Sequence, residues 1–417
     1  MSELSNIQLL KKALWLILIL ISVKGFGQNV EQSVAILDSS DSVLNKRKSI
    51  ESDKKTIKPE VKNKLTSREF YFESGKSSFK FKYGARIQTR FDSWKYKNSN
   101  EEDGSRLYFR RIRFKSDGHL FTPKLGYKIE IDLLNPNMLD AVLKWNFYKN
   151  FTIMAGQTKL RGNRERVISS QNLQLVDRSL LNSQFTLDRD IGVWLLHEAN
   201  LTDVIVRTVL SVSKGEGRYI LMDDDEPISD GLDYTVRLEI LPFGAFKDNG
   251  DYKGGDLERE ERPKLAVGFT YDYNDNAARS RGHKGSFVKS SADLSTWIVD
   301  FMFKYNGFSW MTEYANRQYG GIFTGSDEAQ PNLMDNFYLG NAFNTQAGYM
   351  LGKNYEVAVR YTQVTPLFDY NNLKEYTVVL SKYFVGHKIK MQTDYGILKE
   401  APNTTRSVYR LQFELSL

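Results

Sequence analysis

Apolar and polar residues alternate with a period of two along much of this chain. The pattern is clear in residues 79–91, which read Phe-Lys-Phe-Lys-Tyr-Gly-Ala-Arg-Ile-Gln-Thr-Arg-Phe, and again at the end, Tyr-Arg-Leu-Gln-Phe-Glu-Leu-Ser-Leu. In a β-strand this period places the apolar side chains on one face and the polar side chains on the other. The wall of a transmembrane β-barrel needs one face for lipid and one for water. The pattern therefore predicts an all-β fold, an antiparallel transmembrane barrel.

Strand-like segments of this kind recur from residue 79 to the end, and we count about sixteen. They are residues 79–92, 105–117, 124–134, 138–149, 151–158, 190–198, 201–213, 231–242, 262–273, 293–305, 307–319, 336–351, 354–365, 372–384, 387–398 and 405–417. An even number of strands lets a closed antiparallel barrel have both termini on one side.

The lengths of the connections support this interpretation. Tight turns alternate with longer connections at 93–104, 159–189, 214–230, 274–292 and 320–335. Outer-membrane barrels have short periplasmic turns and long extracellular loops, and we expect the same arrangement here. Residues 243–261 break the alternation, either as an elaborated turn or because the strand count is wrong there.

The first 27 residues have the pattern of a signal peptide. Lys11 and Lys12 precede an apolar run over residues 13–23, which is too short to span a bilayer but suits a signal-peptide core. We therefore predict a cleaved signal at 1–27 and export to the outer membrane of a Gram-negative bacterium. Residues 28–68 are polar and charged, which predicts a flexible periplasmic segment, and the barrel is expected to occupy residues 69–417.

Composition narrows the function. The chain has no cysteine, which excludes disulfides, thiolate metal sites and a lipoprotein anchor. Its formal net charge is +7, and removal of Lys11, Lys12, Lys24 and Glu3 with the signal leaves about +5. A basic chain can bind nucleic acid, but export favours a smaller anionic partner and no nucleic acid. The 23 Tyr and 25 Phe suit the aromatic girdles of a barrel.

The basic residues gather in the first two strands. Residues 79–91 and 105–116 contain nine Lys or Arg and no Asp or Glu. A cationic side chain facing lipid costs roughly 2–4 kcal/mol at the midplane, so we expect these residues to face the lumen and to favour anions. The predicted pore-lining set is Lys80, Lys82, Arg86, Arg90, Arg111, Arg113 and Lys115.

Two features qualify this basic wall. Arg110 falls on the apolar face, which indicates either a position near the membrane edge or a β-bulge that shifts the phase. Glu130 and Asp132 alternate with Ile129 and Ile131, so they too are expected to face the lumen, where pairing with arginines would weaken selectivity. A polar lumen that happens to contain basic residues is the alternative.

The connection at 159–190 is unusually long, and such connections are usually functional. A sixteen-stranded lumen is wide, so selectivity requires a segment that folds inward, and this third long loop is our candidate for the constriction. Its predicted anion-binding residues are Lys159, Arg161, Arg164, Arg166 and Arg178. The alternative is an outward surface loop with solvated ion pairs.

Several short motifs resemble one known family. They are Gly156-Gln157-x-Lys159, Arg164-Glu165, Ser169-Ser170, Asp177-Arg178-Ser179, Arg189-Asp190-x-Gly192, Phe109-x-Arg111-x-Arg113, Tyr127-x-Ile129-x-Ile131-Asp132 and Tyr271-Asp272-Tyr273-Asn274-Asp275. In this order they resemble the phosphate-selective porin O and P family, over roughly residues 70–417. The resemblance implies a sixteen-stranded outer-membrane porin, usually a trimer, with its third loop folded into the pore and a basic ladder that passes phosphate or polyphosphate. The chain departs from many outer-membrane barrels by ending in Leu417 rather than Phe.

These observations predict a porin for passive diffusion of a small anion such as phosphate, pyrophosphate or an organic anion. Its other expected partners are outer-membrane lipid and lipopolysaccharide, and by resemblance two further copies of itself. A general or oligosaccharide-permeable porin is the alternative, and a plugged structural or adhesive barrel is a third hypothesis.

We expect no catalytic residues, no cofactor and no metal. The four histidines form no Ser/His/Asp arrangement by linear proximity, although a triad does not require it. The acidic run at 223–226 lacks the spacing of an EF-hand loop. The basic loop at 279–285, which contains His283, could collect anions at the pore mouth or bind lipopolysaccharide phosphates.

Overall fold

The computed structural model describes residues 64–66, 69–74, 77–218, 230–320, 337–367 and 371–416. All of them belong to one compact unit, Lys62–Leu417. The predicted signal peptide at 1–27 lies outside the described residues, as does most of the predicted segment at 28–68.

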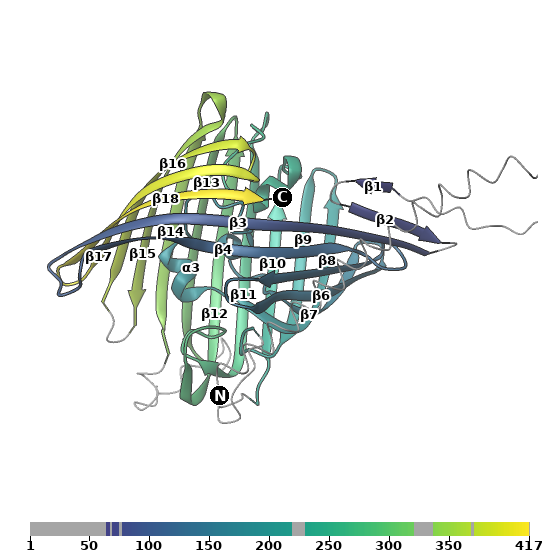
Figure 1. Ribbon diagram of the computed structural model, residues 1–417. Helices are drawn as coiled ribbons and strands as arrows, with labels where there is room; N and C mark the ends of the chain where they lie inside the picture. The colour runs from purple at the N-terminus through teal and green to yellow at the C-terminus, as the bar shows by residue number, and fades with distance from the viewer. Residues whose placement is uncertain are drawn as a thin grey trace, which may run out of the picture. The chain divides into compact units, whose positions relative to one another are not determined.

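Sixteen antiparallel strands form a closed ring (Figure 1). Each strand pairs with the next along the chain, and the last strand pairs with the first, which closes the barrel. The strands are β3 (Ser77–Lys97), β4 (Gly104–His119), β5 (Leu125–Asp132), β6 (Asn137–Tyr148), β7 (Phe151–Lys159), β8 (Arg189–Leu201), β9 (Val204–Ser213), β10 (Asp233–Leu241), β11 (Lys264–Arg279), β12 (Phe287–Tyr305), β13 (Phe308–Tyr319), β14 (Gly340–Met350), β15 (Tyr355–Pro366), β16 (Leu373–Val385), β17 (Ile389–Glu400) and β18 (Thr404–Ser416). The predicted sixteen-stranded barrel is confirmed.

Two short strands precede the ring. They are β1 (Lys64–Thr66) and β2 (Glu69–Ser74), which pair with each other. β2 also pairs with the first residues of β3, while the later part of β3 pairs with β18. One long strand therefore serves both the ring and this small extension.

The wall is apolar outside and polar inside, as the period-two pattern predicts. In β10, Val236 and Leu238 are 45% and 41% exposed, whereas Arg237 and Glu239 are each only 2% exposed. A soluble protein shows the reverse distribution. Lipid contacts the outer face of such a wall, and closure leaves no strand edge with unsatisfied backbone groups.

Two expected long connections are shorter than predicted. β3 continues to Lys97, so the first of these connections is 98–103 instead of 93–104. β11 continues to Arg279 and β12 begins at Phe287, so the second is 280–286 instead of 274–292. β11 passes through register shifts after Asn274 and Ala277. Bulges of this kind keep a strand paired where its sequence stops alternating, and this is why the pattern ended too early.

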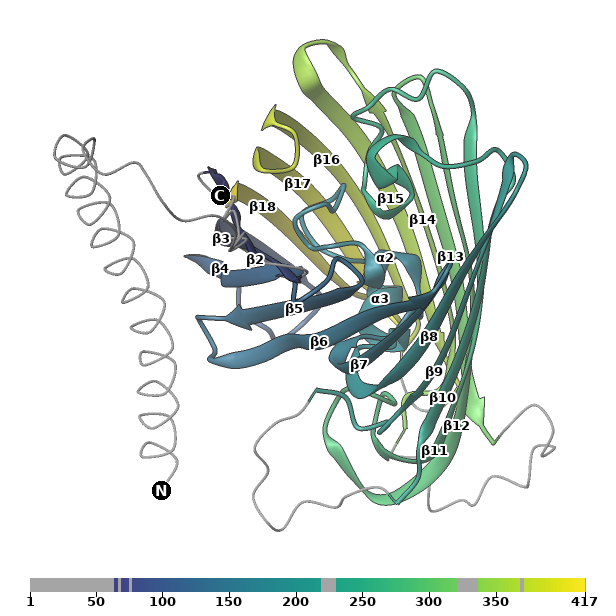
Figure 2. The ribbon, with the colours of Figure 1, turned by 90° about the vertical axis from the view of Figure 1, so that its right-hand side faces the viewer.

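Two connections enter the lumen from opposite ends. Loop L3, residues 160–188, contains the short helices α2 (Arg164–Val167) and α3 (Leu180–Phe185), which lie within the ring of strands (Figure 2). Turn T4, residues 242–263, contains the 3₁₀ helix η1 (Lys247–Tyr252) and is an elaborated turn, so the strand count was right. The two meet where the Gly254 N–H donates to the Asn172 carbonyl at 2.7 Å.

Loop L3 has an apolar core of its own inside the barrel. Leu181 and Phe185 of α3 are fully buried and pack in one cluster with Ile298 and Ala315 of the inner wall. Burial of such side chains contributes roughly 1.5–3 kcal/mol each. No helix in the described part of the chain is long and apolar enough to cross a membrane.

Candidate functional site

Arg164 anchors loop L3 to both the wall and turn T4. Its Nε donates to Oδ1 of Asp300 at 2.8 Å, and its Nη2 bonds the carboxylate of Glu239. Its Nη1 donates to the Asp251 carbonyl at 3.1 Å. Arg164 is fully buried, and a buried arginine is tolerated only when it is paired and hydrogen-bonded in this way. Its geometry is that of a structural anchor.

Three other basic residues of the predicted constriction also brace the loop. Lys159 Nζ donates to the carbonyls of residues 166–168, the first at 2.8 Å. Arg178 donates to two loop carbonyls at 3.0 Å and 2.7 Å, and Arg166 forms an ion pair with Asp188. The cationic groups of these three side chains are therefore bonded to atoms of loop L3 itself.

One carboxylate of loop L3 lies among wall arginines, and we call this group the Asp177 cluster: Asp177, Arg90, Arg110, Arg111 and Arg410. Oδ2 of Asp177 is 2.5 Å from Nη1 of Arg90 and 3.6 Å from Nη1 of Arg410. Oδ1 is 3.7 Å from Nη2 of Arg110. Burial would raise the pKa of the Asp177 carboxyl, but Arg90, Arg410, Arg110 and Arg111 together outweigh burial and lower that pKa, so the carboxylate is ionised.

A β-bulge brings Arg110 into this cluster. Gln88 opposes Arg111, but the next residue, Thr89, opposes Phe109, so Arg110 has no residue opposite it. The extra residue lets Arg110 and Arg111 both face loop L3. The side chain of Arg110 is 37% exposed, compared with 5% for Arg90. A β-bulge was one of the two explanations that the sequence allowed for Arg110. Arg110 itself was not among the predicted pore-lining residues.

Acidic partners neutralise most of the other basic wall residues. Arg86 donates to both carboxylate oxygens of Glu414 and to Ser170 of loop L3. Arg113 lies 3.0 Å from Glu130 and 3.6 Å from an oxygen of Asp132. Glu130 and Asp132 therefore both pair with an arginine of the inner wall, which is the pairing that their place in the alternating pattern made possible.

Arg111 differs from these residues, because its Nη1 donates to the uncharged side-chain oxygen of Gln88 at 2.6 Å. Within the described residues it makes no ion pair with a carboxylate. It is only 8% exposed. It therefore adds positive charge just behind the surface of the lumen.

The remaining predicted residues lie away from the Asp177 cluster. Lys80 and Lys82 are near the start of β3, and Lys115 is near the end of β4, where its Nζ is 2.8 Å from Asp117. Arg161 places its guanidinium 5.9 Å from the centroid of a tyrosine ring in turn T4. The structure thus brings Arg86 and Arg90 into contact with loop L3 through Ser170 and Asp177, and places Arg111 and Arg113 on the neighbouring strand.

Comparisons with known proteins agree with this architecture. Residues 81–408 match the family Phosphate-selective porin O and P. An uncharacterized protein of Aquifex aeolicus (strain VF5) is 22% identical over 380 residues, which cover 79% of this chain and 85% of the relative.

Solved porins share the fold at low identity. OprB of Pseudomonas putida has a TM-score of 0.53 at 8% identity and covers 81% of this chain and 94% of its own. The outer membrane channel DcaP of Acinetobacter baumannii has a TM-score of 0.52 at 11% identity, covering 81% and 97%. The anion-selective porin from Comamonas acidovorans has a TM-score of 0.51 at 8% identity, covering 81% and 99%. With its closed sixteen-stranded barrel, this chain belongs to the phosphate-selective porin O and P family and is an outer-membrane porin.

Proposed function

We propose that this porin passes small anions by passive diffusion and favours oxyanions such as phosphate or polyphosphate. The Asp177 cluster carries the proposal. Three of its four arginines lie beside three carboxylates, Asp177 and the wall residues Asp92 and Asp394, whereas Arg111 pairs with none, so positive charge is in excess beside loop L3.

The chemistry of this surplus suits an oxyanion. A guanidinium presents a planar fork of donors that matches phosphate oxygens better than the point charge of lysine. Arg110 is the most exposed arginine of the cluster and has its nearest carboxylate oxygen at 3.7 Å, a distance that leaves donors available to a solute. Binding must stay modest, because conduction requires the anion to leave again.

A general porin without phosphate selectivity is the second candidate. The observation that favours it is the pairing of Arg86 with Glu414 and of Arg113 with Glu130. Paired charges attract an incoming anion less strongly than free ones. On this alternative, the main role of the wall arginines is to hold loop L3 in place, as Arg86 and Arg90 do through Ser170 and Asp177.

Conductance measurements in planar bilayers test the proposal. The mature chain is purified in detergent, and the reversal potential is read across a KCl gradient. We expect the sign of the reversal potential to show that chloride is more permeant than potassium. We also expect the chloride current to fall as phosphate is added. Cation selectivity would overturn the proposal. Anion selectivity without any effect of phosphate favours the general porin, and a protein without conductance is a plugged barrel.

We also propose that the porin is a homotrimer in contact with outer-membrane lipid and lipopolysaccharide, as its family resemblance implies. Native mass spectrometry in detergent checks the assembly, where a monomeric mass would contradict it. A trimer is expected to close in three equal current steps in the same bilayer recordings.

A further inference from the structure

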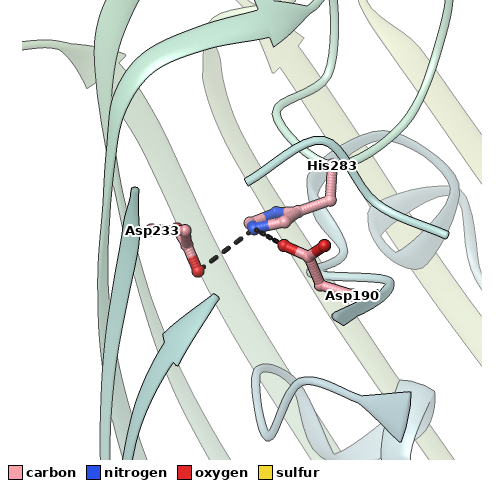
Figure 3. A group of neighbouring side chains, drawn as sticks. All are labelled: Asp190, Asp233 and His283. Carbon is pink, nitrogen blue, oxygen red and sulfur yellow. Dashed lines mark ion pairs between the residues drawn. The ribbon is translucent and has the colours of Figure 1, made fainter. Parts of the chain in front are cut away.

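A second buried cluster lies outside the Asp177 cluster and involves no residue of loop L3. Asp190 is the second residue of β8, Asp233 begins β10, and His283 lies in the connection 280–286 between β11 and β12. The imidazole ring lies between the two carboxylates (Figure 3). Its Nε2 is 3.2 Å from Oδ2 of Asp233 and 3.9 Å from Oδ2 of Asp190.

These three residues are buried and incompletely satisfied. His283 is 3% exposed and both aspartates are fully buried. Within the described part of the chain, neither ring nitrogen of His283 nor Oδ1 of Asp233 makes a hydrogen bond of acceptable geometry. Such unsatisfied buried groups are uncommon, and a bound ion is one recognised explanation.

Neighbouring groups hold the two carboxylates in place. The backbone N–H groups of Gly215 and Ile191 donate to Asp190 at 2.6 Å and 2.8 Å. The hydroxyl of Ser213 donates to Oδ2 of Asp233 at 3.1 Å. Hydrogen bonds of this kind orient the carboxylate ligands of metal sites.

The local charge also calls for a cation. The Thr235 hydroxyl lies 3.2 Å from Oδ2 of Asp233 and 3.1 Å from Oδ1 of Asp272, so a third buried carboxylate adjoins the pair. Burying carboxylates without compensation is costly. A protonated imidazole together with Arg317, which faces Asp272, still carries one positive charge fewer than the three carboxylates.

We propose that Asp190, Asp233 and His283 bind one divalent transition-metal ion, with zinc as the best match. One imidazole nitrogen and two carboxylate oxygens are a donor set that zinc accepts, with a water in the fourth position. Calcium and magnesium prefer oxygen ligands alone. The three ligand atoms lie within 4.8 Å of one another, close enough for a single ion to contact them all.

The ion would join two wall strands to the connection 280–286. The backbone already closes tightly over the histidine, because a Cβ at Gly217 would lie 2.3 Å from the His283 carbonyl oxygen. A metal at this place stabilises the folded loop end of the barrel by its own binding free energy.

Metal titration of the tag-free protein tests the site. The full mature chain in detergent is stripped with EDTA, dialysed and titrated with Zn²⁺ by calorimetry, and bound metal is counted by mass spectrometry. We expect one zinc per chain and a loss of affinity of about ten-fold or more in His283→Gln. His387→Gln is the matched control, since His387 is also buried but lies in the connection between β16 and β17. Wild-type protein without stoichiometric zinc, or His283→Gln with wild-type affinity, overturns the proposal.

A second variant decides the matter if His283→Gln does not fold. The chain has four histidines, and the triple variant His119→Gln, His197→Gln, His387→Gln keeps only His283. It is expected to bind one Co²⁺ with an X-ray absorption signature of one imidazole ligand. If this folded variant binds no Co²⁺, or binds it without an imidazole ligand, His283 is a protonated partner of the aspartates and the metal site is wrong.

Discussion

Replacing Asp177 by Asn should make the pore more selective for anions. The carboxylate oxygens are 3.7 Å from Arg110 and 3.6 Å from Arg410, so an anion on the far side of either guanidinium would be about 7 Å from Asp177. At that distance the carboxylate repels the anion by about 0.6 kcal/mol in bulk water and by about 2.4 kcal/mol at an effective dielectric constant of about 20. Anion affinity should therefore rise between about 3-fold and about 60-fold, with the lower value at high salt, where screening is stronger.

The substitution should leave the barrel folded. Arg90 keeps its bond to Asp92 at 2.7 Å, and Arg410 keeps its bond to Asp394 at 2.7 Å. The assay compares reversal potentials and the phosphate concentration that halves the chloride current. Asp203→Asn, in the exposed turn between β8 and β9, is the control with the same change in charge. An unchanged permeability ratio, or a shift toward cations, in Asp177→Asn would refute the role of the cluster.

Three further predictions follow from the same geometry. Arg110→Gln should lower the anion-to-cation permeability ratio more than Arg113→Gln, because Arg113 is already held by Glu130 and Asp132; equal reversal potentials in the two variants would contradict this. Arg164→Leu leaves the buried carboxylates of Glu239 and Asp300 short of a guanidinium and should destabilise the docking of loop L3 by about 3–5 kcal/mol, seen as a lower thermal midpoint and noisier open channels than in Arg161→Leu. Gly156→Ala should reduce the folding yield, because Gly156 has φ of +121° and a Cβ there would lie 2.2 Å from the Ala141 carbonyl oxygen, whereas Gly126→Ala meets its nearest atom at 3.4 Å and should fold as wild type.

The sequence predicted the barrel because the information that sets it is local. Each strand has apolar residues on its lipid side and polar residues on its water side, so the alternation in the sequence located all sixteen strands. It failed where alternation itself stops, at the bulges after Asn274 and Ala277 and at Arg110. A bulge changes the phase of the alternation without changing which strands pair. For the bulge in β4, the signal in the sequence was the pair of adjacent arginines, Arg110 and Arg111, in an otherwise alternating strand.

The partners of the site residues could not be predicted in this way. Arg86 meets Glu414 only because β18 closes the ring against β3, and Arg90 meets Asp177 only because loop L3 folds inward. Both contacts join residues far apart in the chain, and no local pattern records them. The same holds for His283, which reaches its two aspartates on β8 and β10 from the connection 280–286.

Loop L3 combines two kinds of anchoring that together fix the charges of the pore. Leu181 and Phe185 bury its helix against the wall, and Arg164 ties it to Asp300. A loop held in this way keeps Asp177 at set distances from the wall arginines. If the porin favours anions as proposed, its selectivity depends on how much positive charge remains after pairing rather than on the number of basic residues in the wall. We therefore expect Arg110, the bulge residue, to contribute most, because it has the most exposed side chain of the Asp177 cluster, whereas Arg90 and Arg410 are paired with Asp92 and Asp394.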